Sequence, residues 1–189
     1  DPLMAFEEYV YLDMRKTTNG GTNWNSCLNG LSDATNPSLC LFIAPFAMDP
    51  ENSDVLLAGS DKVWMTDDAA DNWTQVSYSL SSGYLVSAVT VLDSSSDYLA
   101  FAGTTDGSIF RCDNLNPANG TSNSWTNITP PGNNGAWVRR IVASPIDKNQ
   151  LYACYSAYNP SGLLNSRHLW YSGNQGNTWI DISLNLPNV

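Results

Sequence analysis

Ser172-Gly173-Asn174-Gln175-Gly176-Asn177-Thr178-Trp179 is the stretch of this 189-residue chain that decides its fold. A matching phrase runs from Thr17 to Trp24, and both have the order hydroxyl, any residue, Asx, any residue, Gly, any residue, polar residue, Trp. An Asx side chain accepts hydrogen bonds from backbone N–H groups further along the chain, and glycine tolerates the positive φ of a reversal. The phrase therefore predicts a hairpin turn that ends on a tryptophan packed between layers.

Two less complete copies of the phrase lie between these two. The copy from Thr66 to Trp73 has Ala70 in the place of the glycine, so its turn is expected to be more strained. The third copy keeps only the Asx and the tryptophan. The four tryptophans follow one another at intervals of 49, 52 and 54 residues. The residues assigned to these structural turns are Thr17, Asn19, Gly21, Trp24, Thr66, Asp68, Trp73, Asn114, Trp125, Ser172, Asn174, Gly176 and Trp179.

Short apolar segments precede each turn in a constant order. In the second unit they are residues 43–50, 54–60 and 62–66, and a fourth strand begins at Trp73. Strands rich in Val, Ile, Tyr and Trp, separated by Asn, Gly, Ser and Pro at a period near 50 residues, favour the blades of a β-propeller over a sandwich or a solenoid. We therefore predict an all-β chain with one propeller segment of four-stranded antiparallel blades, in units of about 1–40, 41–84, 85–134 and 135–189.

The repeated phrase resembles the Asp-box, or bacterial neuraminidase repeat, Ser/Thr-x-Asp/Asn-x-Gly-x-Thr-Trp. Residues 172–179 match it at every fixed position. The wider unit, with an Asp-Pro such as Asp49-Pro50 and an Ala-Gly such as Ala58-Gly59, is similar to blades of sortilin-type, xyloglucanase-type and sialidase-superfamily propellers. The resemblance covers nearly the whole chain and implies the fold. It implies little about function, because that superfamily includes glycoside hydrolases, receptors and assembly factors.

The first unit is predicted to be incomplete. If each blade begins with an inner strand that ends near Asp-Pro, then Asp1-Pro2 is the tail of an inner strand whose body is absent. Three full blades and one partial blade are expected. An open array exposes strand edges, so we expect remaining blades or a completing chain to cover them. The alternative is a compact closed ring of four blades.

Charge and composition narrow the set of partners. Eight basic and eighteen acidic residues give a net charge of −10, which argues against nucleic acid. No apolar segment is long enough to span a bilayer. Loops rich in Asn, Ser and Thr suit an extracellular or cell-surface protein that binds protein or glycan.

The cysteines and acidic residues offer few sites for metals or cofactors. Cys27 and Cys40 flank the loop between the first two units and are predicted to form a disulfide. Asp67, Asp68 and Asp71 lack the regular ligand alternation of a calcium loop, and Asp68 already belongs to a turn. No metal and no cofactor is expected.

The candidate ligand-binding residues are Trp137, Arg139 and Arg140. They lead into the inner strand of the fourth unit, at the edge where propellers usually bind ligands, and they could stack on and ion-pair with a ligand. The competing interpretation is structural, with one arginine paired to an acidic loop and the other solvated.

Two functions remain open. The first is a non-catalytic binding or scaffolding module. The second is part of a xyloglucanase-like or sialidase-like glycoside hydrolase whose catalytic residues lie mostly outside this segment. A glycosidase requires two carboxylates across its cleft, whereas a binding module requires only aromatic and polar patches.

Overall fold

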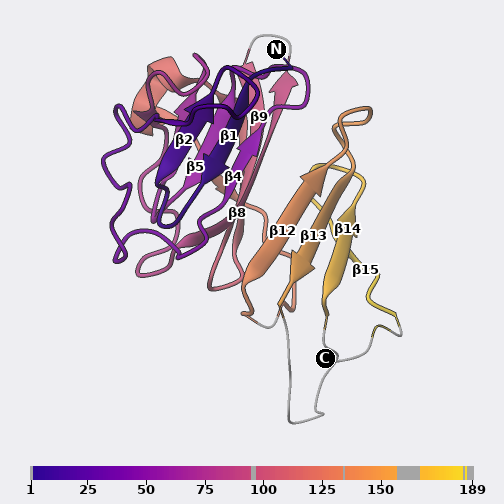
Figure 1. The fold of residues 1–189 in the computed structure, drawn as a ribbon. Coiled ribbons are helices and arrows are strands. Elements are labelled where there is room, and N and C mark those ends of the chain that lie inside the picture. Colours follow the sequence, from indigo (N-terminus) through magenta and orange to yellow (C-terminus); the bar gives the residue numbers. More distant parts are fainter. Residues whose placement is uncertain (1, 95–96, 134, 157–166, 185, 187–189) are drawn as a thin grey trace.

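The computed structural model describes residues 2–94, 97–133, 135–156, 167–184 and 186, and these fold into four antiparallel sheets (Figure 1). We number the sheets as blades in chain order. Blade 1 contains β1 (Ala5–Glu8), β2 (Met14–Thr17) and β3 (Asn25–Ser26). Blade 2 contains β4 (Phe46–Met48), β5 (Leu56–Gly59), β6 (Val63–Thr66) and β7 (Thr74–Gln75).

Blades 3 and 4 repeat this order, and their first and second strands are longer than those of blade 2. Blade 3 contains β8 (Val86–Ser94), β9 (Asp97–Thr104), β10 (Ile109–Leu115) and β11 (Thr126–Asn127), and a 3-10 helix, η1 (Pro117–Ser122), lies between its last two strands. Blade 4 contains β12 (Val138–Ala143), β13 (Leu151–Tyr155), β14 (Leu169–Ser172) and β15 (Ile180–Asp181).

The predicted architecture of three full blades and one partial blade is confirmed. Each four-stranded sheet is a meander with its strands in chain order, and blade 1 has three strands with β1 at its edge. By register, β1 corresponds to the second strands β5, β9 and β13, so the inner-strand position of blade 1 is unoccupied by the described residues. Asp1, which the sequence places in that strand's tail, lies outside the described residues. The fold is a partial β-propeller.

The cores lie between the blades. One apolar cluster packs blade 1 on blade 2, a second packs blade 2 on blade 3, and a third packs blade 3 on blade 4. Side chains alternate along each strand, so one face of a middle blade contacts the preceding blade and the other face contacts the following one. Phe101, for example, is fully buried against blade 4, whereas its neighbours Ala100 and Ala102 belong to the cluster with blade 2. Figure 1 shows blade 4 at one end of the array.

Two glycines permit the closest approach between neighbouring blades. A Cβ on Gly59 would lie 2.5 Å from Val86 Cγ1, and a Cβ on Gly103 would lie 2.4 Å from Val138 Cγ1. Since real side chains do not approach so closely, each glycine makes room for the valine that opens the next inner strand. The inner strands of blades 2, 3 and 4 are thereby drawn together.

Among the described residues, no helix is both long and apolar enough to cross a membrane.

Candidate functional site

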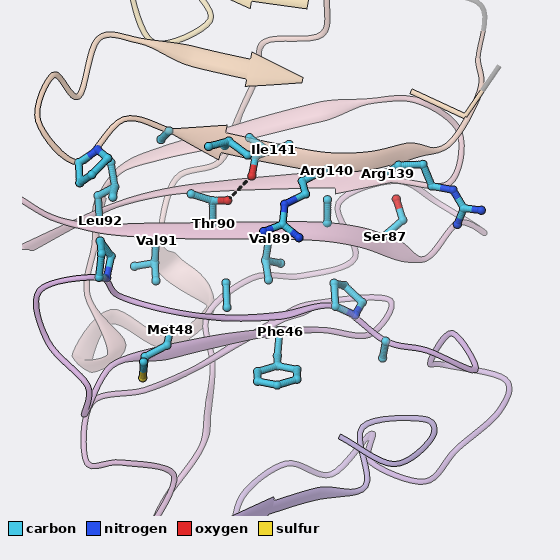
Figure 2. Close-up of a pocket in the computed structure, with 18 of the residues that line it drawn as sticks. Phe46, Met48, Ser87, Val89, Thr90, Val91, Leu92, Arg139, Arg140 and Ile141 are labelled. Atoms are coloured by element: carbon cyan, nitrogen blue, oxygen red, sulfur yellow. Dashed lines mark hydrogen bonds between the residues drawn. The ribbon is translucent and has the colours of Figure 1, made fainter. Parts of the chain in front are cut away.

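The inner strands β4, β8 and β12 lie side by side and form the walls of a groove of about 670 Å³ (Figure 2). Side chains of β8 hold it against β12: Ser87 Oγ donates to the carbonyl of Val138 at 2.7 Å, and Thr90 Oγ1 donates to the carbonyl of Ile141 at 2.6 Å. Because these bonds use the backbone of the neighbouring inner strand, the groove has a fixed width between blades 3 and 4.

The lining of the groove is apolar along most of its length and cationic at one end. Ile43, Met48 and Val142 are all exposed in it, at 75%, 49% and 47% of their surface. Arg139 and Arg140 supply the charged lining, and no carboxylate belongs to the lining formed by the described residues. The groove can therefore hold an apolar surface along its walls and an electron-rich group at its end.

Two of the three predicted ligand-binding residues, Arg139 and Arg140, line this cationic end, and Trp137 lies beside Arg139 without belonging to the lining. The guanidinium carbon of Arg139 lies 5.3 Å from the centroid of the Trp137 ring, and Trp137 itself is 40% exposed. In Figure 2 the Arg140 side chain extends from β12 toward β8, whereas Arg139 points away from the centre of the groove. Neither arginine forms an ion pair or a hydrogen bond with a described residue, so the described part of the chain does not supply the acidic partner of the competing interpretation.

The turns before Trp24, Trp73 and Trp179 share one hydrogen-bond pattern. In blade 4, Ser172 Oγ donates to Asn174 Oδ1 at 2.9 Å and accepts from the Gly176 N–H at 2.8 Å. Asn174 Oδ1 then accepts from the Thr178 N–H at 2.8 Å. The same bonds occur around Thr17 and Asn19 and around Thr66 and Asp68.

Two turns differ from the fully matching copies in instructive ways. Ala70 occupies the glycine place with φ 63°, the left-handed conformation that strains a residue with a Cβ. In blade 3, Asn114 lies within β10 and the turn is closed instead by Asn116 and Asn123. The Asn116 N–H donates to Asn123 Oδ1 at 2.9 Å, and Asn123 Nδ2 donates back to the Asn116 carbonyl at 2.9 Å. Because extra residues lie before Trp125, Asn116 and Asn123 close this turn in place of Asn114.

The turn tryptophans connect each blade to the one before it. Trp73 Nε1 donates to the carbonyl of Cys27 at 2.9 Å, and Trp179 Nε1 donates to the carbonyl of Ile128 at 2.6 Å. Trp125 bonds the carbonyl of Val76 at 3.1 Å in the same way. Each acceptor is the residue directly after the outer strand of the preceding blade. The tryptophan is thus an inter-blade donor as well as an apolar anchor.

The predicted disulfide between Cys27 and Cys40 is not present, since both are free and buried. Cys40 Sγ instead donates to the carbonyl of Asp33 at 3.2 Å. Burial raises the pKa of the Cys27 thiol to about 11 and that of Cys40 to about 12, so both are protonated near neutral pH. They are part of the apolar core between blades 1 and 2.

Sequence reasoning missed a buried carboxylate at the junction of blades 1 and 2. Asp33 accepts from Ser60 Oγ at 2.7 Å, from Lys62 Nζ at 3.1 Å and from Trp64 Nε1 at 3.2 Å. Burial by itself raises the pKa of Asp33, but the hydrogen bonds and the charge of Lys62 outweigh it and lower the pKa overall. A lone aspartate in a polar loop gives no sequence signal for such a network.

Two cations that reach forward into the next blade also lack a sequence signal. Lys16 Nζ donates to the carbonyl of Ala69 at 2.7 Å, and Arg111 donates to the carbonyl of Gln175 at 2.7 Å. These carbonyls occupy the same place in the turns of blades 2 and 4, directly before Ala70 and Gly176. The cations therefore fix the turn of the following blade.

Comparison with known proteins supports the fold. No protein-family model and no curated protein matches the chain. Among solved structures, a GH74 enzyme from Niastella koreensis superposes with a TM-score of 0.67 at 18% identity, over 95% of this chain and 27% of that one. The GH74 xyloglucanase from Xanthomonas campestris gives 0.62 at 14% identity, over 94% of this chain and 27% of that one. A structure of YCF48 bound to D1 peptide gives 0.52 at 13% identity, over 95% and 63%.

These similarities place the chain among β-propellers and extend no further than the fold. The chain spans about a quarter of the length of the two GH74 structures and less than two thirds of the YCF48 structure.

Proposed function

We propose that this chain is a non-catalytic propeller module of a secreted or cell-surface protein, and that it binds a protein or a glycan along the inner-strand groove. The observation that carries the proposal is the pair Arg139 and Arg140, which lines one end of a groove with apolar walls and has no ion-pair partner among the described residues, with exposed Trp137 beside Arg139. An aromatic face and free guanidinium donors suit both the flat faces of sugars and the side chains and carbonyls of a peptide.

Two further observations support this proposal. On a chain of net charge −10, the two arginines concentrate positive charge at one place and would attract an oxygen-rich or anionic group to it. One similar propeller, YCF48, has been solved with a bound peptide. The polar loops of Asn, Ser and Thr suit a location outside the cell.

The test uses two probes, xyloglucan oligosaccharides and an immobilised library of extended peptides, against the unaltered chain. The double substitution Arg139→Ser with Arg140→Ser is expected to weaken binding at least about tenfold, because it removes the free donors. Trp137→Ala is expected to act in the same direction. Tyr78→Ala is the matched control for Trp137→Ala, since Tyr78 is 71% exposed and does not belong to the lining of the groove. Binding that ignores all three groove substitutions would overturn the proposal.

A glycoside hydrolase is the second candidate, because two of the similar structures are GH74 enzymes of which this chain spans 27% each. In that case the groove would form part of a substrate cleft and the paired carboxylates would be supplied from outside the segment. Release of reducing ends from xyloglucan by the 189-residue chain would contradict the non-catalytic proposal.

A further inference from the structure

A second hollow lies between the outer edge of blade 3 and the last turn of blade 4, at the opposite edge of each sheet from the inner strands of the groove. We call it the rim pocket. It is lined by residues 126–129, Pro131 and residues 176–179, and its volume of about 420 Å³ is ordinary for a small-molecule site. None of the described residues lines both the rim pocket and the groove.

The equivalent place at the junction of blades 1 and 2 is filled by the loop after the outer strand. The Asn29 carbonyl accepts from the Trp73 N–H at 2.8 Å, and Asn29 Nδ2 donates to Asn72 Oδ1 at 2.6 Å. Gly30 permits this contact, because a Cβ there would lie 2.2 Å from the Trp73 carbonyl oxygen. Trp73 is accordingly only 4% exposed.

At the junction of blades 2 and 3, the outer strand of blade 2 is covered by the helix η1, which contacts β7. A Cβ on Gly120 of this helix would lie 3.8 Å from the Gln75 carbonyl oxygen, an ordinary packing distance. The insertion in blade 3 therefore covers this part of the rim.

The loop between blades 3 and 4 cannot cover its tryptophan in the way that blade 1 does. Counted from the carbonyl that accepts the indole N–H, Pro130 and Pro131 stand in the places of Asn29 and Gly30. Gly30 has φ of 84°, whereas the proline ring fixes φ near about −65°. The rim pocket is therefore left beside Trp179.

The Trp179 ring has a fixed position in this pocket. Its Nε1 donates to the Ile128 carbonyl at 2.6 Å, and the ring packs against the core between blades 3 and 4. A Cβ on Gly176 would lie 2.4 Å from Ile128 Cδ1 and 3.2 Å from Trp179 Cζ2, so the glycine lets these two side chains approach each other. Trp179 remains half-buried and lines the pocket. A ligand that stacks on this ring does not have to order it first.

Uncharged hydrogen-bonding groups complete the lining. Asn177 Oδ1 accepts from Arg111 Nη1 at 3.1 Å, and Asn127 Oδ1 accepts from the Thr129 N–H at 3.0 Å. Because both oxygens are engaged, the two Nδ2 groups, which have no partner among the described residues, remain as donors. The Thr126 hydroxyl can both donate and accept. Among the described residues, no Asp, Glu, Lys, Arg or His lines the pocket.

We propose that the rim pocket binds a neutral sugar unit of a glycan, with a C–H face of the sugar ring on Trp179 and its hydroxyls on Asn127 and Asn177. The C–H groups of a pyranose ring are weakly positive and suit the negative face of an indole. Sugar hydroxyls accept from the amide donors and donate to the threonine oxygen. A charged sugar would be desolvated there without an opposite charge in the lining. This site is separate from the groove and does not rest on the function proposed for it.

The test is a titration of the ¹⁵N-labelled, unaltered chain with neutral trisaccharides of glucose, galactose and mannose, followed by NMR. The side-chain amide signals of Asn127 and Asn177 and the indole signal of Trp179 are expected to shift. Asn127→Ala and Asn177→Ala should each weaken binding about fivefold, and together at least about tenfold. Asn119→Ala is the matched control, because Asn119 is an exposed asparagine on η1 that lines neither the rim pocket nor the groove.

Three results would overturn the proposal. They are binding to the double asparagine variant as tight as to the unaltered chain, no shift of these signals at about 10 mM of any trisaccharide, and tighter binding of a uronic acid trisaccharide at this site. The chain with Arg139→Ser and Arg140→Ser should bind the neutral trisaccharides at the rim pocket unchanged, so a failure here is distinguishable from a failure at the groove. Circular dichroism of each variant verifies that lost binding does not reflect unfolding.

Discussion

Blades 3 and 4 have the same strand order, yet the described residues cover both faces of blade 3 and only one face of blade 4. The position that separates them is Gly103 in blade 3 and Cys154 in blade 4. Gly103 is buried beneath Val138 with no space for a methyl group, whereas Cys154 is exposed. A covered junction thus depends on the absence of a side chain at a position such as Gly103 as well as on the side chains that pack there. The same substitution at Gly103 and at Cys154 should therefore change the free energy of unfolding by very different amounts.

The largest expected effect comes from giving both positions the same side chain. Gly103→Ala places a Cβ 2.4 Å from Val138 Cγ1 and should lower the free energy of unfolding by about 2–3 kcal/mol, because blades 3 and 4 must separate to admit it. Cys154→Ala should change it by less than about 0.5 kcal/mol. Urea denaturation of both variants checks the pair. Equal costs would show that blade 4 is covered as blade 3 is.

The second comparison concerns the tryptophans at equivalent places in β6 and β14. Trp64 Nε1 donates to Asp33, whereas the buried Nε1 of Trp170 has no partner among the described residues. Asp33→Asn removes a charged acceptor and should cost about 2 kcal/mol at pH 7.

The effect of Asp33 should depend on pH with a defined sign. Its pKa in the folded chain is lowered, so its contribution to stability is complete above the unfolded value of about 3.9 and is lost as pH falls through the folded pKa. The Asp33→Asn variant should therefore lose less stability than the unaltered chain between about pH 4 and pH 2. Urea midpoints at about pH 7, 4 and 2.5 measure this difference. Parallel pH profiles for the two chains would contradict the assignment.

The fold could be predicted from sequence because its signals are local and repeated. A turn such as residues 172–179 contains its own donors and acceptors, so its pattern survives in the sequence whatever surrounds it. The turn role predicted for Asn114 is wrong because an insertion breaks the spacing on which that reasoning depends. Asp33 gives no signal because its partners Ser60 and Lys62 lie nearly thirty residues away in sequence, and only the packing of two blades brings them together.

The candidate groove likewise has a part that could be predicted from the sequence and a part that could not. Sequence reasoning named Trp137, Arg139 and Arg140 from their place before an inner strand; Arg139 and Arg140 line one end of the groove, and Trp137 lies beside Arg139. Sequence reasoning did not predict the apolar walls of the groove. Ile43, Met48 and Val142 belong to two different inner-strand segments and resemble ordinary core residues in sequence.

The smallest expected effect comes from removing one indole N–H group, either that of Trp73, which bonds the preceding blade, or that of Trp24, which has no acceptor among the described residues. Trp73→Phe keeps most of the buried ring but leaves the carbonyl of Cys27 without its donor, which should cost about 1–2 kcal/mol. Trp24→Phe removes the same group where it has no acceptor among the described residues, so the cost should be near zero. Urea denaturation of both variants measures the two costs. Equal costs for Trp73→Phe and Trp24→Phe would contradict this expectation, because the Trp73 N–H has an acceptor in the preceding blade and the Trp24 N–H has none among the described residues.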